Sequence, residues 1–133
     1  MSRRSRAREV ALQMLFEDDV NPRPSIDETK EFLAARLHSS DLEEFCLSLI
    51  QGVRRNQMEL DALLAKTADN WSLDRMAATD RNVLRLGAYE LLYTDTPGRA
   101  AINEAVELAK RYGSANSAPF VNGILDKFLK RTP

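Results

Sequence analysis

Apolar residues recur at helical spacing along most of the chain, and the pattern is clearest between Ala100 and Leu129. Two stripes in this segment follow the i, i+3, i+4, i+7 spacing of one helix face: Ile102, Ala105, Val106 and Ala109, then Val121, Ile124, Leu125 and Phe128. Gly113 lies between them, where we expect it to end the first helix in a left-handed conformation. Gly123 is expected to allow close approach of another backbone. The pattern predicts two consecutive helices that pack as a hairpin.

Capping signals place the helices of the first half of the chain. The first helix is expected to begin within the arginine segment at residues 3–8 and to end near Asp18, before the turn Asn21-Pro-Arg-Pro24. Ser25-Ile-Asp-Glu28 has the spacing of a capping box and opens a short helix. Ser40-Asp-Leu-Glu43 repeats this spacing and opens a longer helix, whose apolar stripe continues to Leu64.

A change of pattern separates this long helix from the next one. Trp71 and Met76 lie on either side of Ser72, as in a hydrophobic staple around an N-cap. Thr79 or Asp80 is expected to cap the helix that follows. These signals give Trp71 a structural role.

The sum of these elements is a helical domain. No stretch alternates apolar and polar residues between turn signals, so a sheet is not expected. We predict an all-α fold of six to seven helices, with residues 1–133 forming a single domain. Two packed three-helix bundles, of about residues 1–68 and 69–133, are the expected arrangement, and a chain of this length buries roughly two-thirds of its unfolded surface.

The charges are distributed unevenly, although the formal net charge is only −1. Residues 1–16 carry four arginines against one acid, whereas residues 17–70 carry twelve acids against six bases. This division indicates a local anion site and a surface suited to a basic partner. No apolar run approaches the roughly 18 residues of a membrane span, and no signal-peptide pattern opens the chain. A reducing cytoplasm is the expected location, with no membrane partner.

Residue types that carry catalysis or bind metals do not cluster in this sequence. The single histidine, His38, lies at a helix end and is expected at the surface, while the single cysteine, Cys46, lies on a buried stripe. Glycine-rich phosphate loops are absent, so we predict no enzyme, no cofactor and no metal site. Glu90 lies on the inward face of its helix and needs a buried partner, either an arginine or the free amides of a helix start.

Arginine and aromatic residues provide the candidate binding site instead. Arginine side chains bind phosphate with two donors, and basic segments that are disordered until bound often hold RNA, although such a segment can equally be a solubilising terminus. Phe16 is either core or a stacking surface for an unpaired base. Phe120 and Asn122 lie near the start of the last helix, where the free backbone amides favour phosphate and an asparagine can bind a base edge. Otherwise Phe120 is a core residue and Asn122 lies on a capped or solvated flank. The candidate RNA-binding residues are Arg4, Arg6, Arg8, Phe16, Lys110, Phe120, Asn122 and Lys127.

Several motifs also resemble one known family. The segments Ala101-Ile-Asn-Glu-Ala-Val-Glu-Leu-Ala-Lys110 and Phe120-Val-Asn-Gly-Ile-Leu125 are similar to the C-terminal signature of NusB, the bacterial transcription antitermination factor. The resemblance continues in Asp80-Arg-Asn-Val-Leu-Arg-Leu-Gly-Ala-Tyr-Glu-Leu91 and in Arg6-Ala-Arg-Glu-Val-Ala-Leu-Gln13. It therefore covers most of the chain.

This resemblance implies a non-enzymatic RNA-binding factor that pairs with NusE, a small-subunit ribosomal protein. Together the pair would hold the single-stranded boxA element of nascent RNA and suppress termination by RNA polymerase, chiefly in ribosomal RNA operons. The arginine segment, Phe16, Phe120 and Asn122 match the family's RNA-binding positions. Phe16 and Asp80 are the expected partner contacts, with Asp80 facing the basic protein.

Two other interpretations remain open at this point. The first is the NusB-like N-terminal domain of an RNA cytosine methyltransferase, which the length of the chain disfavours because no cofactor-binding domain follows. The second is a helical protein-protein adaptor or homodimer that buries its arginines and does not bind RNA directly.

Overall fold

The computed structural model describes residues 2–69 and 71–131. Within them lie six α-helices and one short 3-10 helix, and no strand, which confirms the predicted all-α class. The elements in chain order are α1 (Arg3–Val20), α2 (Ile26–Leu37), α3 (Ser40–Thr67), η1 (Leu73–Arg75), α4 (Ala78–Tyr93), α5 (Gly98–Tyr112) and α6 (Ser117–Arg131).

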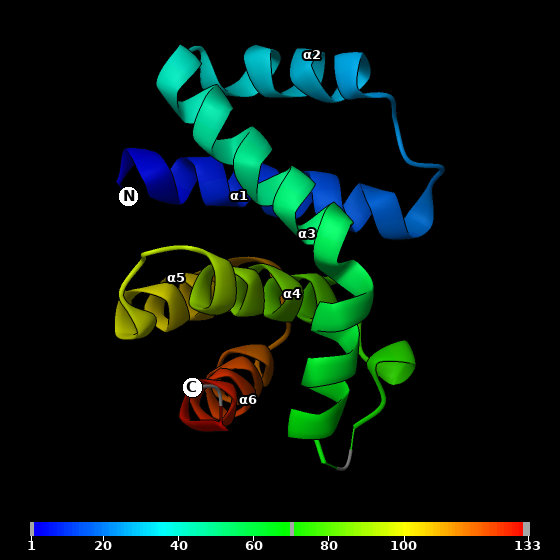
Figure 1. The fold of residues 1–133 in the computed structure, drawn as a ribbon, viewed down its shortest axis with the longest axis vertical. Helices are drawn as coiled ribbons and strands as arrows, with labels where there is room; N and C mark the ends of the chain where they lie inside the picture. The colour runs from blue at the N-terminus through cyan, green and yellow to red at the C-terminus, as the bar shows by residue number, and fades with distance from the viewer. Residues whose placement is uncertain (1, 70, 132–133) are drawn as a thin grey trace.

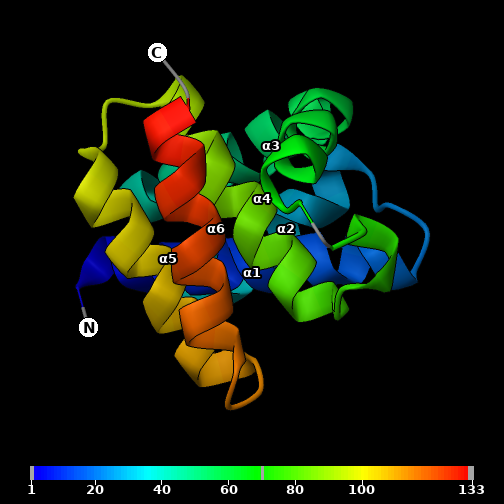
Figure 2. The same cartoon turned by 90° about the horizontal axis from the view of Figure 1, so that it is seen from below.

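The helices pack around one shared core. In Figure 1, α2 lies above α1, and α3 descends past both to reach the level of α4 and α6. Figure 2 shows α5 and α6 side by side, as the apolar stripes predicted. A single cluster of buried side chains includes Val10 of α1, Ile50 of α3, Leu84 of α4 and Leu125 of α6. α3 contacts α1 and α2 before the expected boundary and α4 and α6 after it, so these contacts do not separate two bundles. The division into residues 1–68 and 69–133 stays a prediction.

The observed helix caps agree only in part with those predicted from the sequence. Ser25 and Glu28 form the predicted capping box at α2, with each backbone amide 3.1 Å from the other side chain. At α3 the cap is Ser39, one residue before the predicted Ser40, and its Oγ accepts from the amide of Leu42. The prediction is off by one residue because consecutive serines offer the same capping oxygen at neighbouring positions.

The cap predicted for α4 at Thr79 or Asp80 is wrong because α4 begins at Ala78, whereas Ser72 does lie at the predicted N-cap position, before η1. Neither Ser72 nor the residue before α4 makes a side-chain capping bond. Arg81 holds this turn instead, because its Nη1 donates to the carbonyl oxygens of Leu73 at 3.0 Å and Met76 at 3.1 Å. A side chain from within α4 therefore binds the carbonyl oxygens of the preceding turn, whereas a capping side chain would accept from the free amides of the helix.

Two glycines have roles other than those predicted. Gly113 has φ −95° and ψ −166°, so it is extended and not left-handed. A Cβ at this position would lie 2.3 Å from Oγ of Ser117, which explains why glycine occupies it. The predicted close backbone approach at Gly123 is also wrong, because a Cβ there would meet nothing within 4 Å.

Ion pairs join the helices where charged residues enter the interior. Arg85 of α4 is only 5 % exposed and binds Asp61 of α3 and Asp19 of α1, with closest contacts of 2.8 and 3.1 Å. Burial by itself lowers the pKa of Arg85, but the two carboxylates outweigh it and raise that pKa. Arg54 of α3 pairs in the same way with Asp18, at 2.7 and 2.8 Å. These pairs fix the relative positions of α1, α3 and α4.

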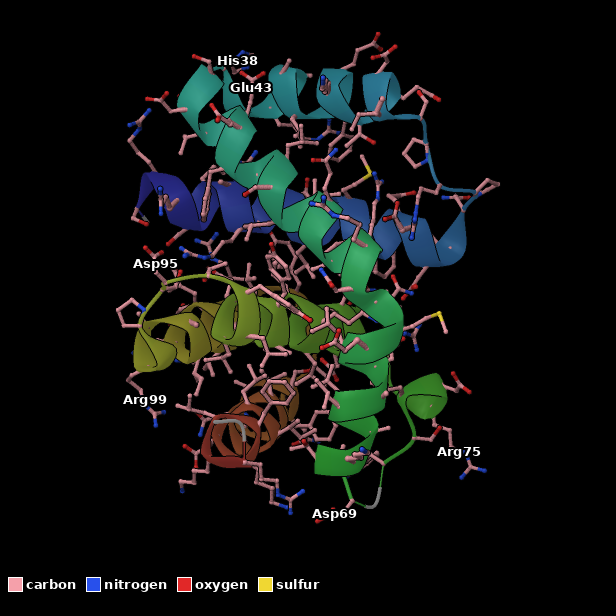
Figure 3. The ribbon with its side chains drawn as sticks, in the orientation of Figure 1. His38, Glu43, Asp69, Arg75, Asp95 and Arg99 are labelled. Carbon is pink, nitrogen blue, oxygen red and sulfur yellow. The ribbon has the colours of Figure 1, made fainter. Side chains whose placement is uncertain are left out.

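The single histidine and the single cysteine lie where the sequence predicted. His38 is exposed at the end of α2 and points away from the molecule (Figure 3). Cys46 is fully buried, and burial raises the pKa of its thiol to about 12. In the described residues, no helix has the length and apolar character needed to cross a membrane.

Candidate nucleic-acid interface

The arginine segment is helical, and its side chains take different directions. α1 begins at Arg3, and Oγ of Ser2 caps it by accepting from the amide of Ser5. The first helix therefore begins within the arginine segment, as predicted. Arg4 is exposed, with its guanidinium carbon 4.2 Å from the centre of the Phe45 ring. Arg6 has a side chain 41 % exposed and donates to Glu9 at 2.8 Å.

Arg8 points into the protein, which corrects its expected role as an RNA contact. Its Nε and Nη2 donate to Glu90, with closest distances of 2.8 Å to each carboxylate oxygen, and Nη1 reaches Glu104 at 3.1 Å. Arg8 is 6 % exposed and Glu90 is 1 % exposed. The prediction that Glu90 is paired with an arginine is confirmed, and Arg8 is the arginine that neutralises it.

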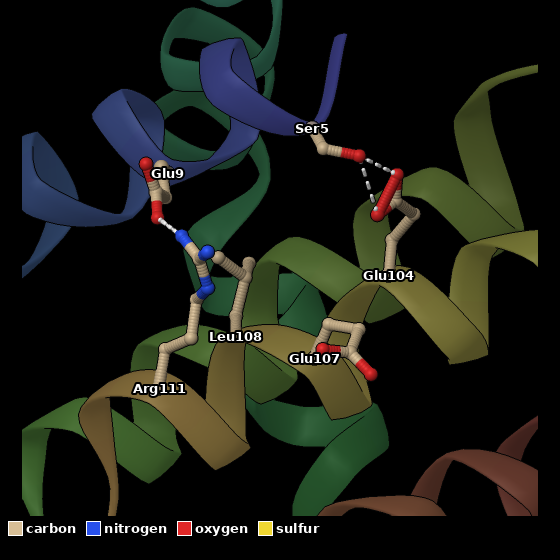
Figure 4. Close-up of a pocket in the computed structure, with 6 residues that line it drawn as sticks. All are labelled: Ser5, Glu9, Glu104, Glu107, Leu108 and Arg111. Carbon is tan, nitrogen blue, oxygen red and sulfur yellow. Dashed lines mark hydrogen bonds and ion pairs between the residues drawn. The ribbon is translucent and has the colours of Figure 1, made fainter. Parts of the chain in front are cut away.

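Two hollows follow one another along the outer side of α1. The first, of about 280 Å³, lies between α1 and α5 (Figure 4). The second, of about 240 Å³, contains Phe16, Thr79 and Tyr112. Phe16 is half-buried, so it belongs partly to the core and partly to the surface of this hollow. The first hollow is lined by Ser5, Glu9, Glu104, Glu107, Leu108 and Arg111.

A third hollow, of about 360 Å³, lies where α4 begins and α5 leads into α6. Its aromatic wall is formed by Trp71 and Phe120, whose ring centroids are 5.1 Å apart in an edge-to-face contact. Asp80 also lines it, and Oδ1 of this carboxylate is buried without a hydrogen-bond partner in the described part of the chain. Arg75 adds a positive charge at the rim and extends outward from η1 (Figure 3). The hollow thus offers an aromatic surface with an acidic residue in its wall.

The remaining predicted residues lie on α5 and α6. Lys127 lines a fourth hollow, of about 280 Å³, on another side of Trp71 and Phe120, and its Nζ is 3.6 Å from Asp69. Asn122 is exposed on α6. Lys110 is exposed on α5, with Nζ 3.5 Å from Glu107.

A family model for the NusB family matches residues 5–130. The chain belongs to the NusB family. The transcription antitermination protein NusB of Anaeromyxobacter dehalogenans is 46 % identical over 137 residues, which cover 99 % of this chain and 94 % of that protein. NusB of Desulfatibacillum aliphaticivorans is 44 % identical over 127 residues, covering 95 % and 89 %. The family assignment made from the motifs is therefore confirmed, and it is a family of transcription antitermination proteins.

Solved NusB structures have the same fold. NusB of T. maritima superimposes with a TM-score of 0.85 at 37 % identity, covering 98 % of this chain and 92 % of the other. A chain from a structure of the antitermination factors NusB and NusE in complex with dsRNA gives a TM-score of 0.87 at 30 % identity, with 99 % of each chain covered. These matches confirm the predicted NusB-like arrangement of helices.

Three residues of these hollows and of the seam between α1 and α5 were not predicted from the sequence. The staple pattern gives Trp71 only a structural role, yet Trp71 is 55 % exposed and lines two hollows. Glu9 and Tyr112 meet across the seam between α1 and α5, which are far apart in the sequence. Of the three, only Trp71 could have been found from the sequence. It is a large apolar residue that lies outside every apolar stripe, which indicates an exposed position.

Proposed function

We propose that this chain binds the single-stranded boxA element of nascent ribosomal RNA together with NusE, and thereby suppresses termination by RNA polymerase in the cytoplasm. The observation that carries the proposal is the series of hollows described above. Consecutive hollows share or adjoin residues: Arg111 and Tyr112 join the first to the second, Thr79 and Asp80 the second to the third, and the Trp71–Phe120 pair the third to the fourth. We call this series the RNA path.

The chemistry of the RNA path suits an unpaired strand. Arg6, which contacts Glu9 of the first hollow, and Lys127 of the fourth supply cations for phosphate oxygens, and Arg4 adds an exposed cation on the first turn of α1. Trp71 and Phe120 offer aromatic edges and faces on which splayed bases stack, and a base within a duplex has no free face for such contact. Lys110 on α5 and Asn122 on α6 are exposed and are proposed as further RNA contacts. Arg8 is left out because its guanidinium is consumed inside the protein.

Phe16 and Asp80 are the proposed contacts with NusE. Asp80 lines the third hollow, and the negative charge of its carboxylate would attract a lysine or arginine of a basic partner. Phe16 lines the adjacent hollow and would add apolar contact area. The structure of NusB and NusE with dsRNA, which this chain matches closely in fold, supports an assembly of this kind.

A binding titration tests the proposal. A fluorescein-labelled boxA RNA is titrated with the chain alone and with NusE added, and a scrambled single strand and a duplex of the same length serve as controls. We expect tighter binding of boxA than of either control, and a further gain in affinity with NusE. Equal binding of all three RNAs would contradict boxA recognition. No RNA binding even with NusE would favour the adaptor or homodimer.

A further inference from the structure

Glu9 lines the first hollow of the RNA path, so an acid lies on a surface that would bind a polyanion. It is 4 % exposed on α1. Oε1 accepts from Arg6 of α1 at 2.8 Å, and Oε2 accepts from Nη1 of Arg111 of α5. The Tyr112 hydroxyl donates to the same carboxylate. Figure 4 shows Glu9 reaching across the seam between the two helices to Arg111.

The carboxylate stays ionised in this position. Burial pushes the pKa of Glu9 upward, but the hydrogen bonds from Arg6, Tyr112 and Arg111 outweigh burial and lower the pKa below its ordinary value. Since Glu9 is buried, it cannot swing away to solvent as an exposed glutamate does. It is therefore a fixed negative point between two guanidinium groups.

The two arginines that Glu9 holds keep much of their surface in contact with solvent. The side chain of Arg6 is 41 % exposed and that of Arg111 is 48 % exposed. Arg8, only two residues from Arg6, is 7 % exposed at its side chain and is enclosed by Glu90 and Glu104. Glu9 thus anchors its arginines without enclosing them, whereas Glu90 and Glu104 enclose theirs.

Anchoring has a physical consequence for phosphate binding. Arginine side chains lose rotamer freedom when they grip a ligand, and two adjacent guanidinium groups repel each other. A carboxylate between them offsets the repulsion and restricts both side chains before the ligand arrives. A planar guanidinium that is already oriented binds phosphate oxygens at a smaller entropic cost.

From this geometry we infer that Glu9 is a positioning residue of the RNA path, which holds Arg6 and Arg111 as an oriented pair for the phosphates of the RNA strand. The inference rests on the proposed RNA-binding function. It makes a prediction opposite in sign to that of simple charge counting. Removal of an acid should strengthen binding of a polyanion if charge alone matters.

The test compares two substitutions that change the net charge equally. Glu9→Gln removes the anchor, and Glu107→Gln removes an exposed acid that lines the same hollow. Each is titrated with fluorescein-labelled boxA RNA in the presence of NusE at several salt concentrations. We expect Glu9→Gln to bind roughly fivefold more weakly than the unmodified chain, because two side chains must then be ordered on binding. Its salt dependence should be shallower by about 0.7 log units for each phosphate that the variant no longer neutralises. Glu107→Gln should bind as tightly as the unmodified chain or more tightly.

A third variant separates the position of the Glu9 carboxylate from its charge. Glu9→Asp keeps the charge and withdraws the carboxylate by one methylene, so it should weaken RNA binding at unchanged net charge. Circular dichroism checks that each variant is folded at the temperature of the titration. Folded Glu9→Gln or Glu9→Asp that binds as tightly as the unmodified chain would overturn the inference. Failure of the unmodified chain to bind RNA would instead refute the proposed function, and the inference would fall with it.

Discussion

The buried pair of Arg8 and Glu90 allows a stringent test of the corrected role of Arg8. Three nitrogen–oxygen contacts of 2.8 to 3.1 Å join the two side chains, which are 6 % and 1 % exposed. Removal of one member leaves a buried charge without its main partner, which costs about 3–5 kcal/mol. Arg8→Met leaves Glu90 with a hydroxyl contact from Thr96 at 3.3 Å, so its cost should lie near the upper end of this range. Glu90→Met leaves Arg8 paired with Glu104, so its cost should lie near the lower end.

Urea unfolding followed by circular dichroism measures these costs, with Arg8→Met, Glu90→Met and the double variant compared as a double-mutant cycle. The double variant removes both charges and keeps apolar volume, so it should lose less than about 1.5 kcal/mol. It should also bind boxA RNA in the presence of NusE as tightly as the unmodified chain.

Two outcomes would refute this reasoning. Single substitutions that each cost below about 1 kcal/mol would show that the pair is not buried as the structure describes. A folded double variant with reduced RNA affinity and a shallower salt dependence would show that Arg8 contacts phosphate after all.

Three further predictions follow from other parts of the structure. Gly52→Ala should destabilise the protein by about 1–3 kcal/mol in urea unfolding, because its Cβ would lie 2.1 Å from Cζ of Tyr89, whereas Gly123→Ala, in open space on α6, should stabilise it by roughly 0.5–1 kcal/mol. The Cys46 thiol is buried and its pKa is about 12, so labelling by a disulfide reagent at pH 8 should occur only as fast as the protein opens; rapid stoichiometric labelling of the folded protein would contradict this. Because the folded-state pKa of Glu9 is lowered, its stabilisation is complete above the unfolded pKa and is lost as pH falls through the folded pKa. Unfolding free energies measured from pH 6 to pH 3 should therefore decline less steeply for Glu9→Gln.

The sequence predicted the helices well and their ends less well. Apolar spacing is a property of each segment by itself, so the α5–α6 hairpin and the long α3 followed from it directly. Caps depend on which nearby group reaches the free amides and carbonyls. Before α4, the carbonyl oxygens of Leu73 and Met76 are bound by Arg81, a side chain from within that helix, and no capping pattern predicts this contact.

For the candidate site, too, the sequence predicted the local features and not those that depend on helix packing. The motifs identify the family and several cations and aromatic residues from the sequence alone, since family signatures are short and local. The direction of each arginine is not local. Arg6 and Arg8 are two residues apart, yet Arg6 is partly exposed and Arg8 is buried. This difference depends on carboxylates from another turn of α1 and from other helices.

The sequence alone thus determined the helical class, the family and the types of residue available for binding phosphate and bases. The tertiary structure decided which of these residues remain at the surface. It buried Arg8 against Glu90, left Trp71 exposed beside Phe120, and brought Arg111 to Glu9 across the seam of α1 and α5. The physical reason is that helical periodicity is set by neighbours a few residues apart. The partner of a charged side chain, in contrast, is set by the packing of helices that are distant in the chain.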